Sequence, residues 1–386
     1  MREEREQTRS RRWRIGLATL GLVGALALAA CGGVGGDDDD SEVQTVPAGD
    51  ASGEVTISNW PLYVDPGKNG SIKEFEELTG IKTDYIEEIN DNTELLGKVQ
   101  QGLEQGDSGG RDMMIVTDFM VAKMIELGYL QKLDKEALPT VQENLVESLI
   151  APTFDPGREY SVPWQSGMTG LVVRTDEAEG VTKIADLFDP KYKGKVTLLT
   201  EMRDTVPAVL RMNGIDPAEA PKEDWLEAID FLQEQVDNGQ IRRFTGNGYT
   251  RDILKGDAAI SLGWSGDAVQ IAADDPNIEF VMPEEGCELW SDNMVIPVGA
   301  PNPQAAQAFM EFAYDPVVQA DIAEWVNFVT PVKGAKEELA SRDPKLAENE
   351  LIFPSEEFLE GCSQARSLDP EEEQEITLAF EKVLGG

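Results

Sequence analysis

The stretch Ala258 to Ala272 holds a tryptophan and a carboxylate at a spacing that suits the binding of an organic cation. Ala259 to Gly263 are predicted to form a short buried strand, and Trp264 and Asp267 follow it directly. Ligands of α/β sheets bind just beyond the carboxyl ends of the strands. At such a place an indole ring attracts a cation through its quadrupole, and a carboxylate neutralises the charge. The alternative is a core tryptophan followed by the N-cap aspartate of a helix.

The chain contains no histidine, which removes the commonest general base and the commonest metal ligand. A triad built on histidine and a zinc–histidine site are therefore excluded. Paired carboxylates such as Glu201 and Asp204 keep a hydrolase open as an alternative. We find no nucleophile at a useful spacing from a base, so we expect no enzymatic activity, no metal and no cofactor.

The first 30 residues have the organisation of an export signal. Four arginines between positions 9 and 14 precede an apolar stretch from Ile15 to Ala30. The sequence Leu28-Ala29-Ala30-Cys31 resembles a bacterial lipobox, which implies cleavage before Cys31 and lipidation of its thiol. An uncleaved anchor helix is the alternative interpretation.

Residues 31–52 are predicted to form an acidic tether, because GGVGG is flexible and DDDDSE repels itself. The formal net charge of −40 argues against nucleic acid and anionic lipid surfaces as partners, since their phosphates would be repelled. The acidic excess suits a cationic ligand or a salt-rich habitat, and composition does not separate the two.

Two runs of alternating strands and helices predict an α/β fold with parallel sheets. The predicted strands are residues 55–59, 81–86, 112–116, 169–174, 195–199, 259–263 and 278–282. The predicted helices are residues 71–79, 92–105, 120–127, 184–188, 225–236, 268–273, 303–313 and 315–326. Interruptions near residues 164, 290 and 330 are interpreted as crossovers between two lobes. The first lobe is then residues 53–164 with 290–329, and the second is residues 165–289 with 330–386.

Cys287 and Cys362 are the thiols that remain once Cys31 is assigned to the anchor. Two thiols in an oxidising compartment often pair. We therefore hypothesise a disulfide between them that pins the C-terminal tail to the second lobe.

Six segments together resemble the spermidine/putrescine-binding family among the extracellular solute-binding proteins of ABC importers. They are SNWPLYVDPG (58–67), TDFMVAKMIELGYLQKLD (117–134), YSVPWQSGMTGLVV (160–173), LFDPKYKGKVTLL (187–199), LGWSGDA (262–268) and WSDNMVIP (290–297). The resemblance covers Val55 to about Ala340. It implies a two-lobed periplasmic-binding-protein-like fold of type II, in which each lobe is a mostly parallel sheet flanked by helices and a hinge joins the lobes.

In that family an extended polyamine is held by aromatic faces along its methylene chain and by carboxylates at its ammonium groups. Carried over position by position, the resemblance implies ligand contacts for Trp60, Tyr63, Thr117, Phe119, Glu201, Asp204, Trp264, Asp267 and Asp292. We add Asp118 as a further candidate acid, since a polyamine needs about one acid per nitrogen. Gln165, Tyr249 and Trp290 are further candidates for the lining. The chain departs from the family at Pro61, where threonine is common, and at Phe119, where a tyrosine hydroxyl would donate a hydrogen bond. Asp118 is an acid that the family does not always have.

The resemblance implies a monomeric, lipid-anchored binding protein on the outer face of the cytoplasmic membrane. It would capture spermidine or putrescine between its lobes and deliver it to an ABC permease. One alternative is a binding protein for another solute, such as a quaternary amine, which a cage of several aromatic rings around one acid would favour. The other is a hydrolase on the same fold.

Overall fold

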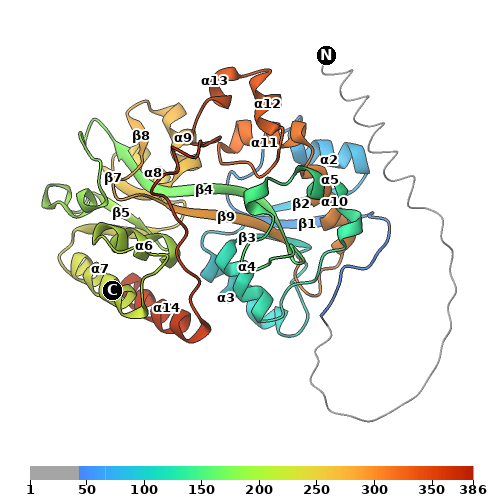
Figure 1. Ribbon diagram of the computed structural model, residues 1–386, viewed down its shortest axis with the longest axis horizontal. Helices are drawn as coiled ribbons and strands as arrows, with labels where there is room; N and C mark the ends of the chain where they lie inside the picture. The colour runs from blue at the N-terminus through green and yellow to red at the C-terminus, as the bar shows by residue number, and fades with distance from the viewer. Residues whose placement is uncertain (1–42, 66, 386) are drawn as a thin grey trace, which may run out of the picture.

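In the computed structural model, which describes residues 43–65 and 67–385, one nine-stranded mixed sheet runs through both lobes (Figure 1). Its strands are β1 (Glu54–Asn59), β2 (Lys82–Glu87), β3 (Met113–Thr117), β4 (Ser161–Arg174), β5 (Val196–Leu199), β6 (Ile241–Thr245), β7 (Ile260–Trp264), β8 (Ile278–Val281) and β9 (Glu288–Val295). Their order across the sheet is β2-β1-β3-β9-β4-β7-β5-β6, and β8 pairs with β4.

The first lobe is built on β1, which pairs in parallel with β2 and β3. The segment MMIVT of β3 is almost entirely buried, which explains its continuous apolar run. The helices of this part are α2 (Ser71–Thr79), α3 (Asn92–Leu103), α4 (Asp118–Glu126), α5 (Pro139–Asn144), α10 (Pro303–Ala313) and α11 (Pro316–Val326). Gly80 ends α2 in the left-handed conformation, as its position after the helical pattern predicts.

The second lobe repeats this plan on β5, which pairs in parallel with β6 and β7. Its helices are α6 (Met202–Met212), α7 (Lys222–Asp237), α8 (Tyr249–Lys255) and α9 (Ser265–Asp274). Sequence analysis missed β6, α6 and α8. Pro207 lies inside α6, and a proline at such a position predicts a break instead of a helix. Only Ile241 of β6 is fully buried, so the strand lacks a strong apolar pattern.

Two long strands connect the lobes. Strand β4 spans 14 residues and pairs antiparallel with β9 over most of its length, then with β7 and β8. Strand β9 also pairs antiparallel with β3 of the first lobe. The sequence predicted a strand only from Thr169, because Pro163 and Gly167 interrupt the pattern before it. The register of β4 shifts at Pro163, where the strand continues despite the missing N–H.

The C-terminal part contacts both lobes. Helices α12 (Ala335–Ala340) and α13 (Pro344–Ala347) pack beside α11, where Leu339 and Ala347 bury against Ala320. Helix α14 (Pro370–Leu384) packs on α7 of the second lobe. The sequence analysis assigned all of residues 330–386 to the second lobe. Short 3₁₀ helices occur at Lys135–Ala137, Glu147–Leu149, Ile184–Phe188 and Pro190–Tyr192.

Cys287 and Cys362 are disulfide-bonded, with their Cα atoms 4.4 Å apart. The predicted signal segment, Cys31 and the tether up to residue 42 lie outside the described residues. Among residues 43–65 and 67–385, no helix is long and apolar enough to cross a membrane.

We expect the disulfide to stabilise the fold, because it closes a long loop in the unfolded chain. The two cysteines are 75 residues apart. The chain-entropy treatment gives a loop of that length about 4 kcal/mol of stabilisation. Replacing both cysteines with serine should lower the free energy of unfolding by about that amount, measured by urea denaturation. An unchanged midpoint would contradict this expectation.

Candidate ligand-binding site

A cavity between the two lobes brings together the residues that the sequence analysis selected. It has a volume of about 940 Å³, including the space at its open mouth. The ten predicted contact residues all line it: Trp60, Tyr63, Thr117, Asp118, Phe119, Glu201, Asp204, Trp264, Asp267 and Asp292. Lining residues that the sequence analysis did not select include Asn92, Arg203, Asn247, Phe328 and Gln364.

The sheet explains why residues so distant in sequence meet here. Trp60 follows β1, Thr117 ends β3, and Trp264 ends β7. Glu201 and the first turn of α6 follow β5. The carboxyl ends of the parallel strands of both lobes thus face the cavity, which is where α/β sheets bind ligands.

Asp292 is the central acid on the first-lobe side. It lies on β9, opposite Thr117 of β3. The Tyr63 hydroxyl donates to its Oδ2 at 2.9 Å, and the Thr117 hydroxyl donates to its Oδ1 at 2.7 Å. Burial raises the pKa of Asp292 to about 7, although both hydrogen bonds oppose that shift. The hydrogen bonds from Tyr63 and Thr117 hold both carboxylate oxygens of Asp292 in a fixed orientation.

Asp204 is the corresponding acid on the second-lobe side. The Thr169 hydroxyl donates to its Oδ1 at 2.6 Å, and Trp264 Nε1 donates to its Oδ2 at 3.0 Å. Trp290 Nε1 donates in turn to the Thr169 hydroxyl at 3.1 Å. Burial raises the pKa of Asp204 to about 6. The indole N–H of Trp264 therefore orients this acid while its ring forms part of the cavity wall.

Asp267 does not cap the helix that contains it. It lies in the first turn of α9, and no side chain caps that helix. Its carboxylate instead accepts hydrogen bonds from the Tyr249 hydroxyl at 2.8 Å and from Asn247 Nδ2 at 3.1 Å. Burial raises its pKa to about 6. The interpretation of Asp267 as a helix cap is therefore wrong.

Two further acids are engaged differently. Asp118 accepts from Asn293 Nδ2 at 2.7 Å and from Gln364 Nε2 at 2.8 Å, and burial raises its pKa. Glu201 accepts from Asn92 Nδ2 at 3.0 Å, and this bond joins the two lobes. Burial and the nearby Asp91 raise the pKa of Glu201 well above its ordinary value.

Aromatic rings enclose the acids in an edge-to-face network. Trp60 and Trp264 have ring centroids 5.9 Å apart, and Trp264 and Trp290 are 6.5 Å apart. Phe328 lies 5.6 Å from Trp290 and 5.1 Å from Tyr63. Trp60 Nε1 donates to the carbonyl of Ile115 at 3.0 Å, which fixes that ring. These apolar faces suit methylene groups and cations alike.

Two of the candidate lining residues lie behind the wall. Tyr249 is fully buried, and its hydroxyl accepts from the Trp264 amide at 2.9 Å while it donates to Asp267. Gln165 is also fully buried and donates to Gln319 at 3.0 Å. Phe328 was missed because it follows a helix in a short turn without periodic pattern.

Within the part of the chain that the structure describes, the arginines of the cavity wall are paired with acids other than the central ones. Arg203 and Arg366 line the cavity, but Arg203 pairs with Glu373 at 3.1 Å and Arg366 pairs with Glu372 at 2.8 Å. The hydrogen bonds described for Asp204, Asp267 and Asp292 all come from neutral donors. No acidic group among the described residues is arranged to hold a metal ion. The site therefore suits an organic cation with apolar carbons between or beside its charges.

A family model described as bacterial extracellular solute-binding protein matches residues 70–353. The chain is 28% identical over 312 residues to the spermidine/putrescine-binding periplasmic protein of Escherichia coli K12, over 80% of this chain and 86% of that relative. It is 26% identical over 382 residues to a putrescine/agmatine-binding protein of Pseudomonas aeruginosa, over 94% and 98% of the two chains. A solved spermidine/putrescine ABC transporter substrate-binding protein of Streptococcus pneumoniae superimposes with a TM-score of 0.69 at 26% identity, covering 86% and 98%. The family match and this structural match confirm the predicted α/β binding-protein fold.

The raised pKa values predict an unusual dependence of stability on pH. The folded state holds protons on Asp204, Asp267 and Asp292 up to about pH 6, 6 and 7, well above the ordinary aspartate value of 3.8. Since the unfolded chain releases these protons at lower pH, their contribution to the free energy of unfolding falls as pH rises from about 4 to 7.

Asp267→Asn removes one of these groups, so the decline with pH should be less steep in this variant than in the unaltered protein. Urea denaturation at a series of pH values measures the slope. Asp230→Asn, on the exposed surface of α7, is the matched control and should keep the original slope. Equal slopes in both variants would contradict the assignment.

Proposed function

We propose that the ligand of this chain is a polyamine such as spermidine or putrescine. The chain belongs to the family of bacterial extracellular solute-binding proteins, which bind solutes without chemical turnover. The observation that carries the proposal is the set of three buried carboxylates held by neutral donors between aromatic rings. The polyamine-binding relatives give independent support.

Desolvation explains why a cation with several ammonium groups fits. Burial raises the pKa of Asp204, Asp267 and Asp292, so each carboxylate is less stable here than in water. An ammonium group that enters a dry cavity also loses its hydration and becomes less stable than in water. Bringing the two charges together offsets both penalties, and the fixed donors of each acid reduce the reorganisation that binding requires.

A quaternary amine is the second candidate, because the rings of Trp60, Trp264 and Trp290 are close neighbours. A cation–aromatic cage of that kind needs one central charge. The carboxylates instead occur on both lobes, each with its own pair of donors. This distribution favours a ligand with several separated charges. Titration with a choline-type cation beside putrescine and spermidine tests the choice.

Contacts from both lobes would couple binding to closure. Trp60, Tyr63 and Asp292 lie on the first-lobe side, and Asp204 and Asp267 lie on the second. We propose that a bound polyamine stabilises the closed arrangement over the open one, because it contacts both sets. An ABC permease would then receive the solute from this closed, monomeric form.

We also propose that the protein is held at the outer face of the cytoplasmic membrane through Cys31. The resemblance of residues 28–31 to a lipobox supports this, and so does the extracellular location of the family. The acidic tether would keep the binding lobes away from an anionic bilayer by charge repulsion.

Asp267→Asn should weaken polyamine binding, because it removes a charge partner from a desolvated ammonium group while it keeps the shape. We expect a loss on the order of 2–5 kcal/mol of binding free energy. Trp264→Ala should cost a comparable amount, since it removes both packing and cation–π attraction. Isothermal titration calorimetry with spermidine and putrescine measures both.

Asp230→Asn is again the matched control, because that exposed charge is screened by salt. Equal weakening by Asp267→Asn and Asp230→Asn would mean that diffuse negative charge binds the ligand, and the proposed site would be wrong.

Cys31→Ala should release the protein from the membrane or leave its precursor uncleaved. Stable anchoring requires more than one lipid chain, so more than one is expected on the processed N-terminus. Membrane fractionation and mass spectrometry of the N-terminus test this in bacterial cells. A normally processed variant that stays in the membrane fraction would refute lipid anchoring at Cys31.

A further inference from the structure

Residues 362–367, here named the strap, run along the cavity toward α14 and lie in the dark red chain that crosses the middle of Figure 1. The disulfide fixes the first residue of the strap to Cys287, directly before β9. The Ser363 amide donates to the Cys287 carbonyl at 3.1 Å, and the Leu289 amide donates to the Ser363 carbonyl at 3.1 Å. The strap therefore begins as a short extension of the sheet.

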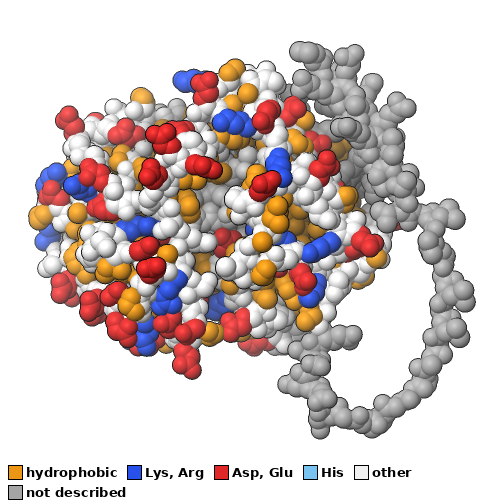
Figure 2. Space-filling view, viewed as in Figure 1, with side chains coloured by type: hydrophobic (Ala, Val, Ile, Leu, Met, Phe, Trp, Pro, Cys, Tyr) orange, Lys and Arg blue, Asp and Glu red, His pale blue; other side chains and the backbone are white. Residues whose placement is uncertain are grey.

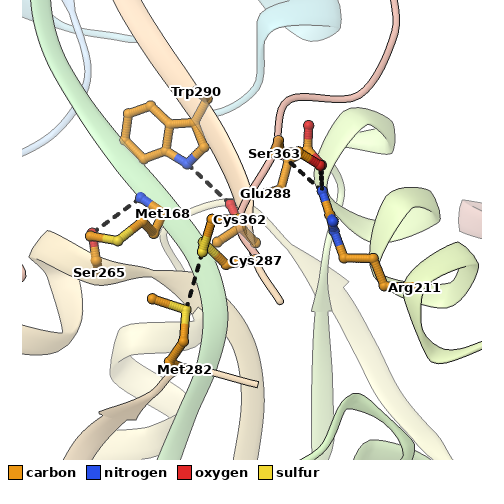
Figure 3. The surroundings of a disulfide bond; sticks show 10 residues. Met168, Arg211, Ser265, Met282, Cys287, Glu288, Trp290, Cys362 and Ser363 are labelled. Carbon is orange, nitrogen blue, oxygen red and sulfur yellow. Dashed lines mark hydrogen bonds and ion pairs between the residues drawn. A yellow bond between two sulfur atoms is a disulfide. The ribbon is translucent and has the colours of Figure 1, made fainter. Parts of the chain in front are cut away.

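A buried ion pair holds the same end of the strap (Figure 3). Arg211 of α6 donates to Glu288 Oε2 at 2.9 Å and to the Ser363 carbonyl at 2.8 Å. The side chains of Arg211 and Glu288 are only 6% and 7% exposed. Glu288 also accepts from the Ala365 amide. Breaking such a pair leaves an uncompensated buried charge, so these contacts resist local opening.

The other end of the strap is also held by the second lobe. Arg366 donates to the carbonyl of Ala220 at 2.6 Å and pairs with Glu372 of α14 at 2.8 Å. Arg203 of α6 donates to the Arg366 carbonyl at 3.0 Å. The strap must therefore move with the second lobe when the lobes separate.

Gln364 reaches from the strap to the first lobe. Its Nε2 donates to Asp118 Oδ2 at 2.8 Å, at the start of α4. Asn293 holds the other oxygen of Asp118 at 2.7 Å, so the acceptor has a fixed orientation. Gln364 itself is exposed at the rim of the cavity. Separation of the lobes would break this bond, because Gln364 is held by the second lobe and Asp118 lies on the first.

We propose that the strap is an interlobe latch, in which Cys287, Cys362 and Arg211 are positioning residues that act on ligand retention through Gln364 and Asp118. The inference rests on the proposed function for its ligand. A strap released from the sheet samples many conformations, and Gln364 then reaches Asp118 in only a fraction of them. The disulfide raises that fraction without touching the ligand, and the closed state lasts longer.

The test uses the full extracellular chain with spermidine and putrescine, and stopped-flow tryptophan fluorescence to separate the association and dissociation rates. Gln364→Ala and the Cys287→Ser/Cys362→Ser double variant should each raise the dissociation rate by about tenfold, the lower end of the range for one hydrogen bond to a charged group. The association rate should change much less than the dissociation rate, since most affinity differences among variants of one binding site arise in dissociation. Gln101→Ala, on the exposed side of α3, is the matched control and should leave both rates unchanged.

Combining the variants isolates the latch from general destabilisation. Loss of the disulfide and loss of the Gln364 side chain both remove the same interlobe latch. Gln364→Ala should therefore have little further effect on the dissociation rate in the cysteine-free background. Effects that multiply to about a hundredfold would overturn the proposal, and so would an unchanged dissociation rate after loss of the disulfide. Gln364→Ala keeps the test valid if the cysteine-free chain folds poorly.

A readout without ligand separates this proposal from the proposed function. Small-angle X-ray scattering of the ligand-free protein should give a larger radius of gyration for Gln364→Ala than for Gln101→Ala. If no polyamine binds but this difference is present, the proposed function is wrong and the latch stands. Identical scattering curves would refute the latch whatever the ligand is.

Discussion

The carboxylates at the junction of the two lobes are removed from water, and their desolvation determines how the site is built. The ionised carboxylates of Asp204, Asp267 and Asp292 would be more stable in water than in the cavity, as their raised pKa values indicate. The fold keeps them inside with hydroxyl, amide and indole donors that carry no charge. Such donors orient an acid without neutralising it. A cationic ligand would supply the charge that these donors lack, which is the basis of the proposed closure around a polyamine.

The hydrogen bonds of Asn92 extend this constraint from one lobe to the other. Its Nδ2 donates both to Glu201 of the second lobe at 3.0 Å and to the Thr117 hydroxyl at 2.9 Å. Thr117 then donates to Asp292 in the cavity. A continuous chain of hydrogen bonds thus joins an acid at the contact between lobes to an acid in the site. This chain of hydrogen bonds links the contact between the lobes to the orientation of Asp292.

The sequence predicts the lining of the cavity better than it predicts the outlying elements. Trp60, Thr117 and Trp264 are recognisable because each directly follows or ends a buried strand, and parallel strands gather their carboxyl ends at one edge. No local sequence pattern identifies the residues that form hydrogen bonds with Trp60, Thr117 and Trp264. Phe328 and Gln364 reach the cavity only through the packing of distant segments, which periodicity does not record. Helix α6 was missed because Pro207 contradicts the local helical preference, and tertiary burial of nearly the whole helix overrides that preference.

The overall acidity of the chain affects the encounter with cations, whereas the acids of the site affect which cation is preferred. Acidic side chains are scattered over both lobes of the face seen in Figure 2. Exposed charges act through salt-screened potentials that reach about 10 Å, so they raise the local concentration of every cation alike and mainly speed encounter. Discrimination needs groups whose energy depends on where a ligand places its charges. The buried acids meet that requirement because each has fixed donors and little water. A bare metal cation has no methylene groups to pack against the walls of Trp60 and Trp264, whereas an organic cation with a methylene chain gains from acids, cation–π attraction and apolar packing together.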